Sequence, residues 1–313
     1  MNLTRLKYFV KIVDIGSLTQ AAEVLFIAQP ALSQQLATLE GELKQQLLIR
    51  TKRGVTPTEA GKILYAHAQV ILRQCEQAMG DVLASSKALT GKVSVGLAPG
   101  TAASTLSWPL LKRVREQHPG IVLYLNENFG TTLSELIMSG RMDMGVLYGD
   151  KVIHGLSFEP LAKEPLYLVS SPKRDLPSVD VSLKDIAQWD LLMPRTYNVV
   201  RKLVDEACLG IGVTLNVIAE IESSTTLSAA IENDLGVTIL PKSAAMALSK
   251  QTEAKLYRIV SPIVEAPLAL CLSDHLPLSI PAQAVKDILL ELVAELLPKP
   301  ALSEEKTQNM ALA

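Results

Sequence analysis

The order of elements predicted for the first 58 residues, three helices and then a short basic hairpin, constrains the fold more than any other feature. Apolar residues recur at helical spacing over 3–13, and a break at Gly16 ends this first helix. Residues 17–20 read Ser-Leu-Thr-Gln, which predicts a capping box at the start of a second helix. A third helix is predicted over 29–43, because Pro30 suits a first turn and leucines follow at helical spacing.

The third predicted helix has two distinct faces when its residues are placed at about 100° intervals. The apolar face is formed by Leu32, Leu36, Leu39 and Leu43. The second face, which is polar but uncharged, is formed by Gln29, Pro30, Ser33, Gln34 and Ala37. A helix that meets only water usually carries Lys and Glu, whereas Gln, Ser and small residues suit the base edges and thymine methyls of a major groove. Taken alone, the pattern leaves a solvated face and a groove-reading face both open.

The segment after this helix favours the groove-reading interpretation. Residues 47–50 predict a short strand, 51–54 a basic turn and 55–56 a return strand. The hairpin places Arg50, Lys52 and Arg53 near its tip, where they suit phosphates or a minor groove. Three helices followed by a basic hairpin predict a winged helix-turn-helix over residues 1–58.

The motifs of this region resemble those of the LysR-type transcriptional regulators. The matching segments are Leu18-Thr19-Gln20-Ala21-Ala22, Gln29-Pro30-Ala31-Leu32-Ser33-Gln34-Gln35-Leu36, Leu39-Glu40, Arg50 and Thr56-Pro57-Thr58-Glu59-Ala60-Gly61. Residues 1–78 and 96–103 look most like the members of that family that control nitrogen assimilation. One departure is visible at Leu48-Ile49-Arg50, where many members carry a Phe before the arginine, and it changes packing rather than contact.

The resemblance implies a sequence-specific DNA-binding regulator, activator or repressor, with its helix-turn-helix over 18–37. It implies that Gln29, Ser33 and Gln34 read bases beside Pro30, and that Thr19, Gln20, Arg50, Lys52 and Arg53 hold phosphates. The partners it implies are double-stranded DNA with a partly palindromic operator, RNA polymerase, and further copies of the chain in a dimer or tetramer. The alternative is a solute-binding sensor without its own DNA reading.

A long linker helix is predicted over 59–89, with Thr56 as its cap and Pro57 in its first position. Its apolar residues alternate spacings of four and three, which is a heptad seam that favours pairing of two helices. The seam is formed by Leu64, Ala68, Ile71, Cys75, Ala78, Val82, Ser85 and Leu89. A dimerisation helix and a helix packed on its own domain are both consistent with this pattern. Cys75 lies on the seam and is interpreted as a packing residue.

Residues 90–297 alternate predicted strands and helices, which indicates parallel α/β sheets. Strands are expected at 93–97, 121–127, 143–148, 166–170, 191–192, 215–220, 237–240 and 268–272, and helices at 104–118, 133–139, 197–209, 224–233 and 281–297. Two similar series, with crossings near 161–163 and 262–267, predict lobe I over 90–161 plus 267–297 and lobe II over 162–266. This part looks like the two-lobed periplasmic-binding-protein-like effector domain of the family, followed by a flexible tail over 298–313. The fold class is therefore multidomain, α and α/β.

Ligands of such folds bind where strands end and helices begin, between the lobes. The candidate pocket residues are Gly100, Thr101, Ser104, Thr131, Tyr148, Arg195, Ser224 and Thr225. Free N–H groups there favour an anion, which Arg195 would reinforce. The same Ser and Thr residues also suit simple helix caps. Because Ala102-Ala103 leaves the first loop poor in hydroxyls, a small-molecule effector is compatible with the sequence but not required by it.

Charge, cysteine content and the lack of catalytic motifs narrow the classes of protein to which the chain can belong. Residues 1–58 hold seven Lys/Arg and four Asp/Glu, a net +3 in a chain whose total is −2, which suits a local anion-binding surface. Three distant cysteines indicate a reducing compartment without structural disulfides. Cys208 is interpreted as inert, because peroxide-sensing relatives carry a second cysteine about nine residues away and this chain has Val199 there.

No signal peptide or membrane span is predicted, so the chain is expected in the cytoplasm. The four histidines are scattered, and phosphate-loop and Gly-x-Ser-x-Gly motifs are missing, so no metal, cofactor or enzymatic activity is expected.

Overall fold

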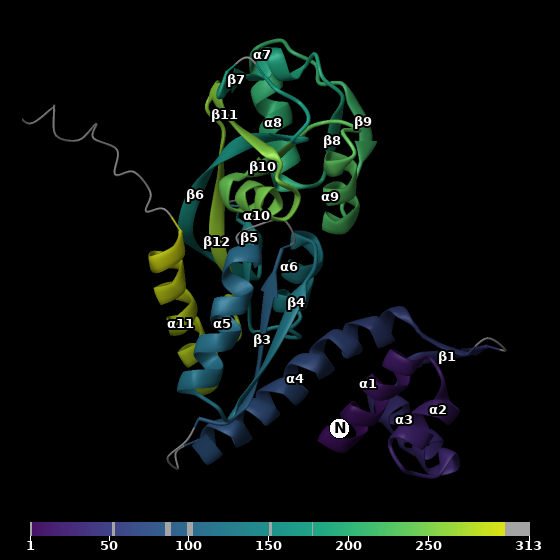
Figure 1. The fold of residues 1–313 in the computed structure, drawn as a ribbon. Helices are drawn as coiled ribbons and strands as arrows, with labels where there is room; N and C mark the ends of the chain where they lie inside the picture. Colours follow the sequence, from purple (N-terminus) through teal and green to yellow (C-terminus); the bar gives the residue numbers. More distant parts are fainter. Residues whose placement is uncertain are drawn as a thin grey trace, which may run out of the picture. The chain divides into compact units, whose positions relative to one another are not determined.

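The computed structural model describes residues 2–51, 54–84, 89–98, 103–149, 152–176 and 178–297 (Figure 1). The chain divides into two compact units. The smaller unit contains the described residues up to position 84 together with Met138–Arg141, and the larger unit contains the others. The side chains of Asp81, Leu83, Ala84, Ala103 and Ser104 lie outside what the structure describes, as do residues 52–53, 85–88, 99–102, 150–151, 177 and 298–313. The predicted seam residue Ser85 is among them.

The smaller unit confirms the predicted order of three helices and a hairpin. Its elements are α1 (Leu3–Ile15), α2 (Leu18–Val24), α3 (Gln29–Leu43), β1 (Leu48–Thr51), β2 (Gly54–Pro57) and α4 (Glu59–Ala84). Gly16 ends α1 in the left-handed conformation, and the Ser17 hydroxyl caps α2 by accepting the Gln20 amide. Ala21 and Ala22 are buried, so their small side chains let neighbouring helices pack closely against α2.

The start of α4 corrects the sequence-based prediction of its cap. Thr56 was expected to cap the helix, but it pairs with Ile49 in the hairpin, and pairing continues to Pro57 opposite Leu48. The cap therefore lies two residues later than Thr56, and the helix begins at Glu59. The Thr58 hydroxyl accepts the Gly61 amide at 3.0 Å and donates to the Gln46 carbonyl at 2.7 Å, so Thr58 is the cap and also ties α4 to the hairpin.

Gly61 lies where α4 crosses the start of the hairpin. A Cβ atom at this position would lie 2.0 Å from the Leu47 carbonyl oxygen and 3.2 Å from the Cβ of Pro57. The backbone of α4 can approach the hairpin this closely only because residue 61 has no side chain. The contact fixes where the linker helix leaves the helix–hairpin unit.

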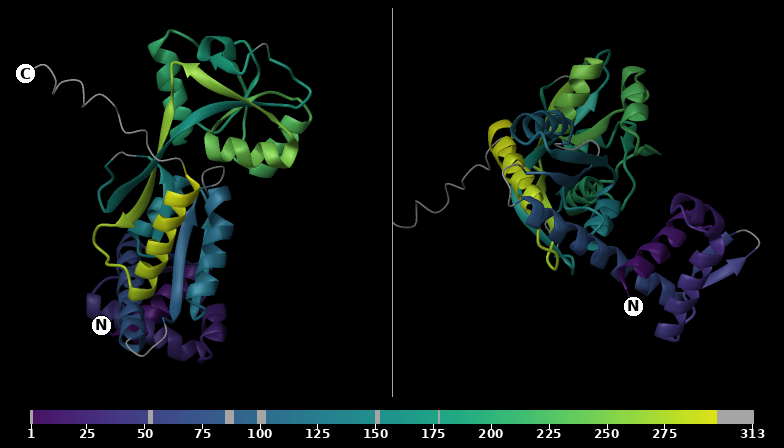
Figure 2. Two further views of the ribbon diagram at one scale, coloured as in Figure 1. Left: turned by 60° about the vertical axis from the view of Figure 1, so that its left-hand side comes forward. Right: turned by 90° about the horizontal axis from the view of Figure 1, so that it is seen from below.

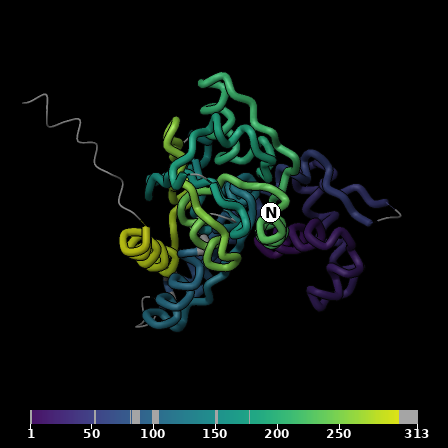
Figure 3. The backbone as a smooth tube through the Cα atoms, turned by 45° about the horizontal axis from the view of Figure 1, so that its top comes forward, coloured from purple at the N-terminus to yellow at the C-terminus, as the bar shows by residue number. Residues whose placement is uncertain are grey.

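The larger unit is a mixed α/β structure. Its helices are α5 (Ala103–Gln117), α6 (Gly130–Met138), α7 (Leu183–Ile186), α8 (Val199–Gly210), α9 (Ser224–Glu232), α10 (Lys242–Thr252) and α11 (Ile280–Leu296). Its strands are β3 (Gly91–Leu97), β4 (Ile121–Glu127), β5 (Met144–Tyr148), β6 (Leu156–Ser170), β7 (Asp180–Ser182), β8 (Leu191–Met193), β9 (Val217–Glu220), β10 (Thr238–Pro241), β11 (Lys255–Ser261) and β12 (Glu265–Ser273). Helix α11 lies alongside α5 (Figure 3), where Arg113 donates to both carboxylate oxygens of Glu295 at 2.9 and 2.8 Å.

The sheets of this unit are mixed, not parallel throughout as predicted. Strands run in the order β4-β3-β5-β12-β6-β11-β7, with β10 also paired to β6, and β8 pairs with β9 separately. The first three of these strands are parallel, whereas β12 is antiparallel to both β5 and β6, and β10 and β11 are antiparallel to β6. The predicted strand over 166–170 is the last third of β6. Strands β7 and β11 and helices α7 and α10 were not predicted.

Two long strands connect the two halves of the larger unit (Figure 2). We call the part on β3, β4 and β5 the first half and the part on β10 and β11 the second half. Strands β6 and β12 pair from Leu156–Ser273 to Pro165–Glu265, so they run side by side from one half to the other. The segments near 161–163 and 262–267 were expected to cross between the lobes. Residues 161–163 lie within the continuous strand β6, and β12 begins at Glu265 within the second segment.

A buried carboxylate joins the two halves beside these strands. Glu164 on β6 is 1% exposed, and its Oε1 accepts the Tyr148 hydroxyl at 2.9 Å while its Oε2 accepts the Ser243 amide at 2.7 Å. Tyr148 ends β5 in the first half, and Ser243 lies in the first turn of α10 in the second half. The positive end of α10 also favours a carboxylate there.

Replacing Gly61 with Ala should destabilise the smaller unit by about 1–3 kcal/mol, because the added methyl group meets backbone that cannot move away alone. Gly80→Ala, at a position with no atom within 4 Å of the added methyl, is the matched control in the same helix and should gain up to about 1 kcal/mol of helix propensity. Thermal unfolding followed by far-UV circular dichroism measures both. Equal stabilisation by the two substitutions would contradict the proposed close approach.

Replacing Tyr148 with Phe should lower the free energy of unfolding of the larger unit by about 1.5–3 kcal/mol, because the buried Glu164 carboxylate loses a donor. Both tryptophans, Trp108 and Trp189, belong to this unit, so their fluorescence during urea unfolding reports it. Tyr124→Phe makes the same chemical change on an exposed ring and should change stability by less than about 0.5 kcal/mol. Similar small effects of both substitutions would refute the role assigned to Glu164.

Candidate nucleic-acid interface and cleft

Helix α3 presents the uncharged surface that its sequence predicts. Its leucine face is buried at Leu32, Leu36 and Leu39, whereas Leu43 at the end of the helix remains 38% exposed. The opposite face is exposed except for the half-buried Ser33, and it comprises Gln29, Pro30, Ser33, Gln34 and Ala37. This surface can donate and accept hydrogen bonds without the desolvation cost of a charge, which suits base edges.

The N-terminus of α3 is open to a ligand. Its N-cap residue is Ala28, which supplies no side-chain hydrogen bond, and Pro30 follows in the first turn. The exposed backbone amides and the positive end of the helix dipole are therefore available for an anion such as a phosphate. The open end is adjacent to Gln29, which is exposed.

The hairpin is joined to this helix by a pair of candidate residues. Arg50 Nη2 donates to Ser33 Oγ at 3.0 Å, so the structure brings together the candidate phosphate contact on β1 and the candidate base contact on α3. Thr19 and Gln20 are exposed in the first turn of α2. Lys52 and Arg53 fall outside the described residues.

Glu40 is a positioning residue that sequence reasoning named only as part of a motif. Its Oε1 accepts the Leu47 amide at 2.8 Å and the Leu48 amide at 3.3 Å, which fixes the first strand of the hairpin against the end of α3. The only signal in the sequence was a carboxylate placed just before the helix ends. The position of this carboxylate does not by itself show that it accepts backbone amides seven and eight residues further along the chain.

The linker seam has two parts in the structure. Leu64 packs against the core of the smaller unit and Ala68 is fully buried, so the start of the seam packs on its own domain. Further along α4, Met79 and Val82 are 62% and 74% exposed. Leu89 packs against the core of the larger unit and does not extend the seam. Of the other seam residues in this second part, Ile71 and Cys75 are half-buried and Ala78 is exposed.

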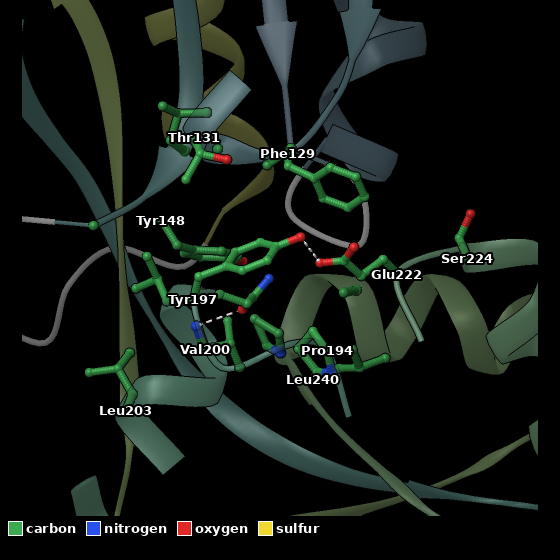
Figure 4. A pocket seen from close by; sticks show the side chains of 18 of the residues that line it. Phe129, Thr131, Tyr148, Pro194, Tyr197, Val200, Leu203, Glu222, Ser224 and Leu240 are labelled. Carbon is green, nitrogen blue, oxygen red and sulfur yellow. Dashed lines mark hydrogen bonds between the residues drawn. The ribbon is translucent and has the colours of Figure 1, made fainter. Parts of the chain in front are cut away.

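The larger unit contains a cleft of about 990 Å³ (Figure 4). Helix α6 and the end of β5 line it from the first half, and α8, α9 and α10 line it from the second. Of the candidate residues, Thr131, Tyr148 and Ser224 line the cleft, whereas Arg195 and Thr225 are not part of its lining. Gly100, Thr101 and the side chain of Ser104 lie outside the described residues. Ser223 caps α9 by accepting the Thr226 amide at 3.2 Å. Its hydroxyl therefore acts as a helix cap, which is the alternative to ligand binding that the sequence leaves open for the Ser and Thr residues of this region.

The charges of the cleft disfavour the expected anion. Its charged lining residues among those described are Glu127, Glu135, Glu206, Glu222 and Lys202. Tyr197 donates to Glu222 Oε1 at 2.5 Å across the cleft wall (Figure 4), and this hydrogen bond raises the pKa of Tyr197 above its ordinary value. Arg195 is not itself a lining residue, but its charge acts on the Tyr197 hydroxyl, where it opposes the rise in pKa. Carboxylates outnumber cations among the described lining residues, so their charges do not favour the expected anion.

Two of the three cysteines are buried, and burial changes the acidity of their thiols. Cys208 and Cys271 are buried free thiols, and burial raises the pKa of Cys271 to about 12 and that of Cys208 above its usual value. Among the residues that the structure describes, no three His, Cys, Asp or Glu side chains gather as metal ligands. Over the same ranges, no helix has the length and apolar character needed to cross a membrane.

Comparison with known proteins places both parts of the chain. Residues 3–62 match the family model described as a bacterial regulatory helix-turn-helix protein of the lysR family, and residues 86–294 match the LysR substrate binding domain. The nitrogen assimilation regulatory protein nac of Klebsiella aerogenes is 54% identical over 308 residues, covering 98% of this chain and 99% of that protein. Its counterpart in Escherichia coli K12 is 54% identical over 294 residues, covering 94% and 96%.

Solved structures show the same fold at lower identity. A full-length cysteine-to-aspartate variant of OxyR from Pseudomonas aeruginosa has a TM-score of 0.73 at 24% identity and covers 94% of each chain. Full-length CbnR complexed with its target DNA has a TM-score of 0.69 at 21% identity, covering 94% of this chain and 99% of that one. The two family models and the full-length relatives establish that this chain belongs to the LysR family of bacterial transcriptional regulators.

Proposed function

We propose that this regulator binds a specific operator as a homo-oligomer and controls genes of nitrogen assimilation. The observation that carries the DNA-reading part is the exposed, uncharged face of α3, joined to the hairpin by the hydrogen bond from Arg50 to Ser33. Similarity to the two nac proteins over nearly their full length supports the nitrogen-assimilation part. A protein that reads chromosomal DNA acts in the cytoplasm, and it needs no catalytic activity to do so.

The reading surface makes two kinds of contact with DNA, one to bases and one to phosphates. Gln29, Ser33 and Gln34 read base edges beside Pro30 in the major groove, because amide and hydroxyl groups match the donors and acceptors there. Thr19, Gln20, Arg50, Lys52 and Arg53 hold phosphates and so fix the orientation of α3. Arg50 also positions the Ser33 hydroxyl, since the two already contact each other without DNA.

Self-association supplies a second copy of this reading surface. The proposed dimer contact is the seam of α4, which pairs with the same helix of another chain through its second part, where Ala78 and Val82 are exposed. The seam is formed by Leu64, Ala68, Ile71, Cys75, Ala78 and Val82. The larger unit adds further apolar surface, with Trp108 and Leu111 exposed on α5 and Val122 and Tyr124 exposed on β4. Two reading helices then occupy half-sites about one DNA turn apart.

We assign the domains accordingly: DNA reading to 1–58, oligomerisation to 59–89 and regulation to 90–297. The cleft of the regulatory part accommodates a small effector without requiring one, and RNA polymerase is the partner through which a bound regulator changes transcription. The rival function, a solute-binding sensor without DNA reading, has the cleft in its favour. It leaves the open N-terminus of α3 and the hairpin contact without a role.

Replacing Gln29 or Ser33 with Ala should relax specificity at one base position per half-site and weaken binding by about 1–3 kcal/mol for each good base contact that the substitution removes. Lys52→Ala should weaken binding to all duplexes alike and reduce the salt dependence, because it removes a phosphate contact. Titrations of operator and random duplexes by fluorescence anisotropy separate these effects. Equal weakening on both duplexes for all three variants would refute the division of contacts.

Deleting the gene should change transcription of nitrogen-assimilation operons, because the two nac proteins that this chain resembles over nearly their full length are nitrogen assimilation regulatory proteins. RNA sequencing of the deletion strain, of a strain with the gene restored, and of a strain carrying Gln29→Ala measures this. Restoration by the intact gene only is the expected result. A transcriptome that responds to the deletion in other pathways alone would contradict the nitrogen assignment.

A further inference from the structure

The turn between α2 and α3 holds a residue that neither the backbone nor the core explains. Leu25 ends α2, the Phe26 amide donates to the Glu23 carbonyl at 3.1 Å, and the Ile27 amide donates to the Ala22 carbonyl at 3.1 Å. This pair of hydrogen bonds is a Schellman motif, whose central residue must adopt the left-handed conformation. Phe26 occupies that position with φ 53°.

Phenylalanine is a poor choice for the geometry of this turn. The left-handed conformation suits Gly and, less often, Asn, because a Cβ atom crowds the following carbonyl oxygen. Burial does not compensate, since the Phe26 side chain is 94% exposed and Ile27 makes the apolar contact with the core. The turn therefore carries both backbone strain and an aromatic ring in water. Such a combination indicates a contact outside the chain.

The position of Phe26 indicates what that contact is. Phe26 lies three residues before Gln29, on the turn that leads into the uncapped N-terminus of α3. Ala28 and Gln29, which follow it, are also exposed. The end of a recognition helix that enters the groove brings its preceding turn close to the DNA. An aromatic ring there has one apolar group to meet in the major groove, the 5-methyl group of thymine.

We propose that Phe26 is a further specificity-determining residue, whose ring packs against a thymine methyl group at the edge of each half-site. This inference rests on the proposed DNA-reading function and adds a base preference to it. Gln29 and Ser33 recognise hydrogen-bonding groups, whereas Phe26 recognises an apolar one. The strain at the turn is retained because the aromatic ring contributes to selection of the operator.

The test uses full-length protein, an operator duplex recovered by selection from random DNA, and copies of it with single thymines replaced by deoxyuridine, which lacks the methyl group. Phe26→Asn should bind the operator at least about fivefold more weakly. Deoxyuridine at one position per half-site should weaken the natural protein by a similar factor and leave the variant unchanged. Leu209→Ala, which removes a side chain that is 82% exposed on α8, is the control and should bind normally.

Stability separates this role from a structural one. Phe26→Asn should raise, not lower, the thermal unfolding midpoint, because Asn tolerates the left-handed conformation. Reduced affinity together with raised stability and a missing response to deoxyuridine would confirm the proposal. Unchanged operator affinity of Phe26→Asn, or the same deoxyuridine response in both proteins, would overturn it, as would a variant that binds DNA normally but fails only in transcription. Failure of the natural protein to select any operator would instead refute the proposed function itself.

Discussion

Burial of the leucine face of α3 is the constraint on which the surface of the DNA-reading unit depends. Leu32, Leu36 and Leu39 are each at most 3% exposed, and burying a leucine side chain contributes about 1.5–3 kcal/mol. No other rotation of α3 would bury the three together, so the uncharged face must point outward. Glu40 then fixes the hairpin at the end of the same helix through the Leu47 and Leu48 amides. The hydrophobic core thus determines which polar groups are presented, and the carboxylate determines where the hairpin lies beside them.

A different constraint organises the larger unit. Its two halves share β6 and β12, and the buried Glu164 carboxylate accepts donors from both sides of this connection. Tyr148 is at once a lining residue of the cleft and a donor to Glu164. A ligand that contacts Tyr148 therefore touches a group that holds the two halves together. Tyr148 therefore links the lining of the cleft to the carboxylate that both halves share.

Local sequence features predicted the helices of the first unit well, and features that depend on distant residues were missed. The α3 faces, the Ser17 cap and the Gly16 stop follow from spacing and residue type within one or two turns. Thr58 as the cap of α4 could not be deduced, because the pairing of Thr56 with Ile49 decides it. The antiparallel course of β12 and the unbroken length of β6 likewise depend on pairing between residues about a hundred positions apart. The carboxylates that line the cleft come from four separate segments, so only the folded chain shows that they outnumber the cations among its described lining residues.

In the function proposed above, one uncharged helix face and its basic hairpin read a specific DNA site in two copies. Selection from a random duplex library with purified full-length protein tests it most directly. We expect enrichment of a two-fold symmetric site whose half-sites lie about one DNA turn apart. Binding that depends only on salt concentration, with no sequence enriched after repeated rounds, would contradict it.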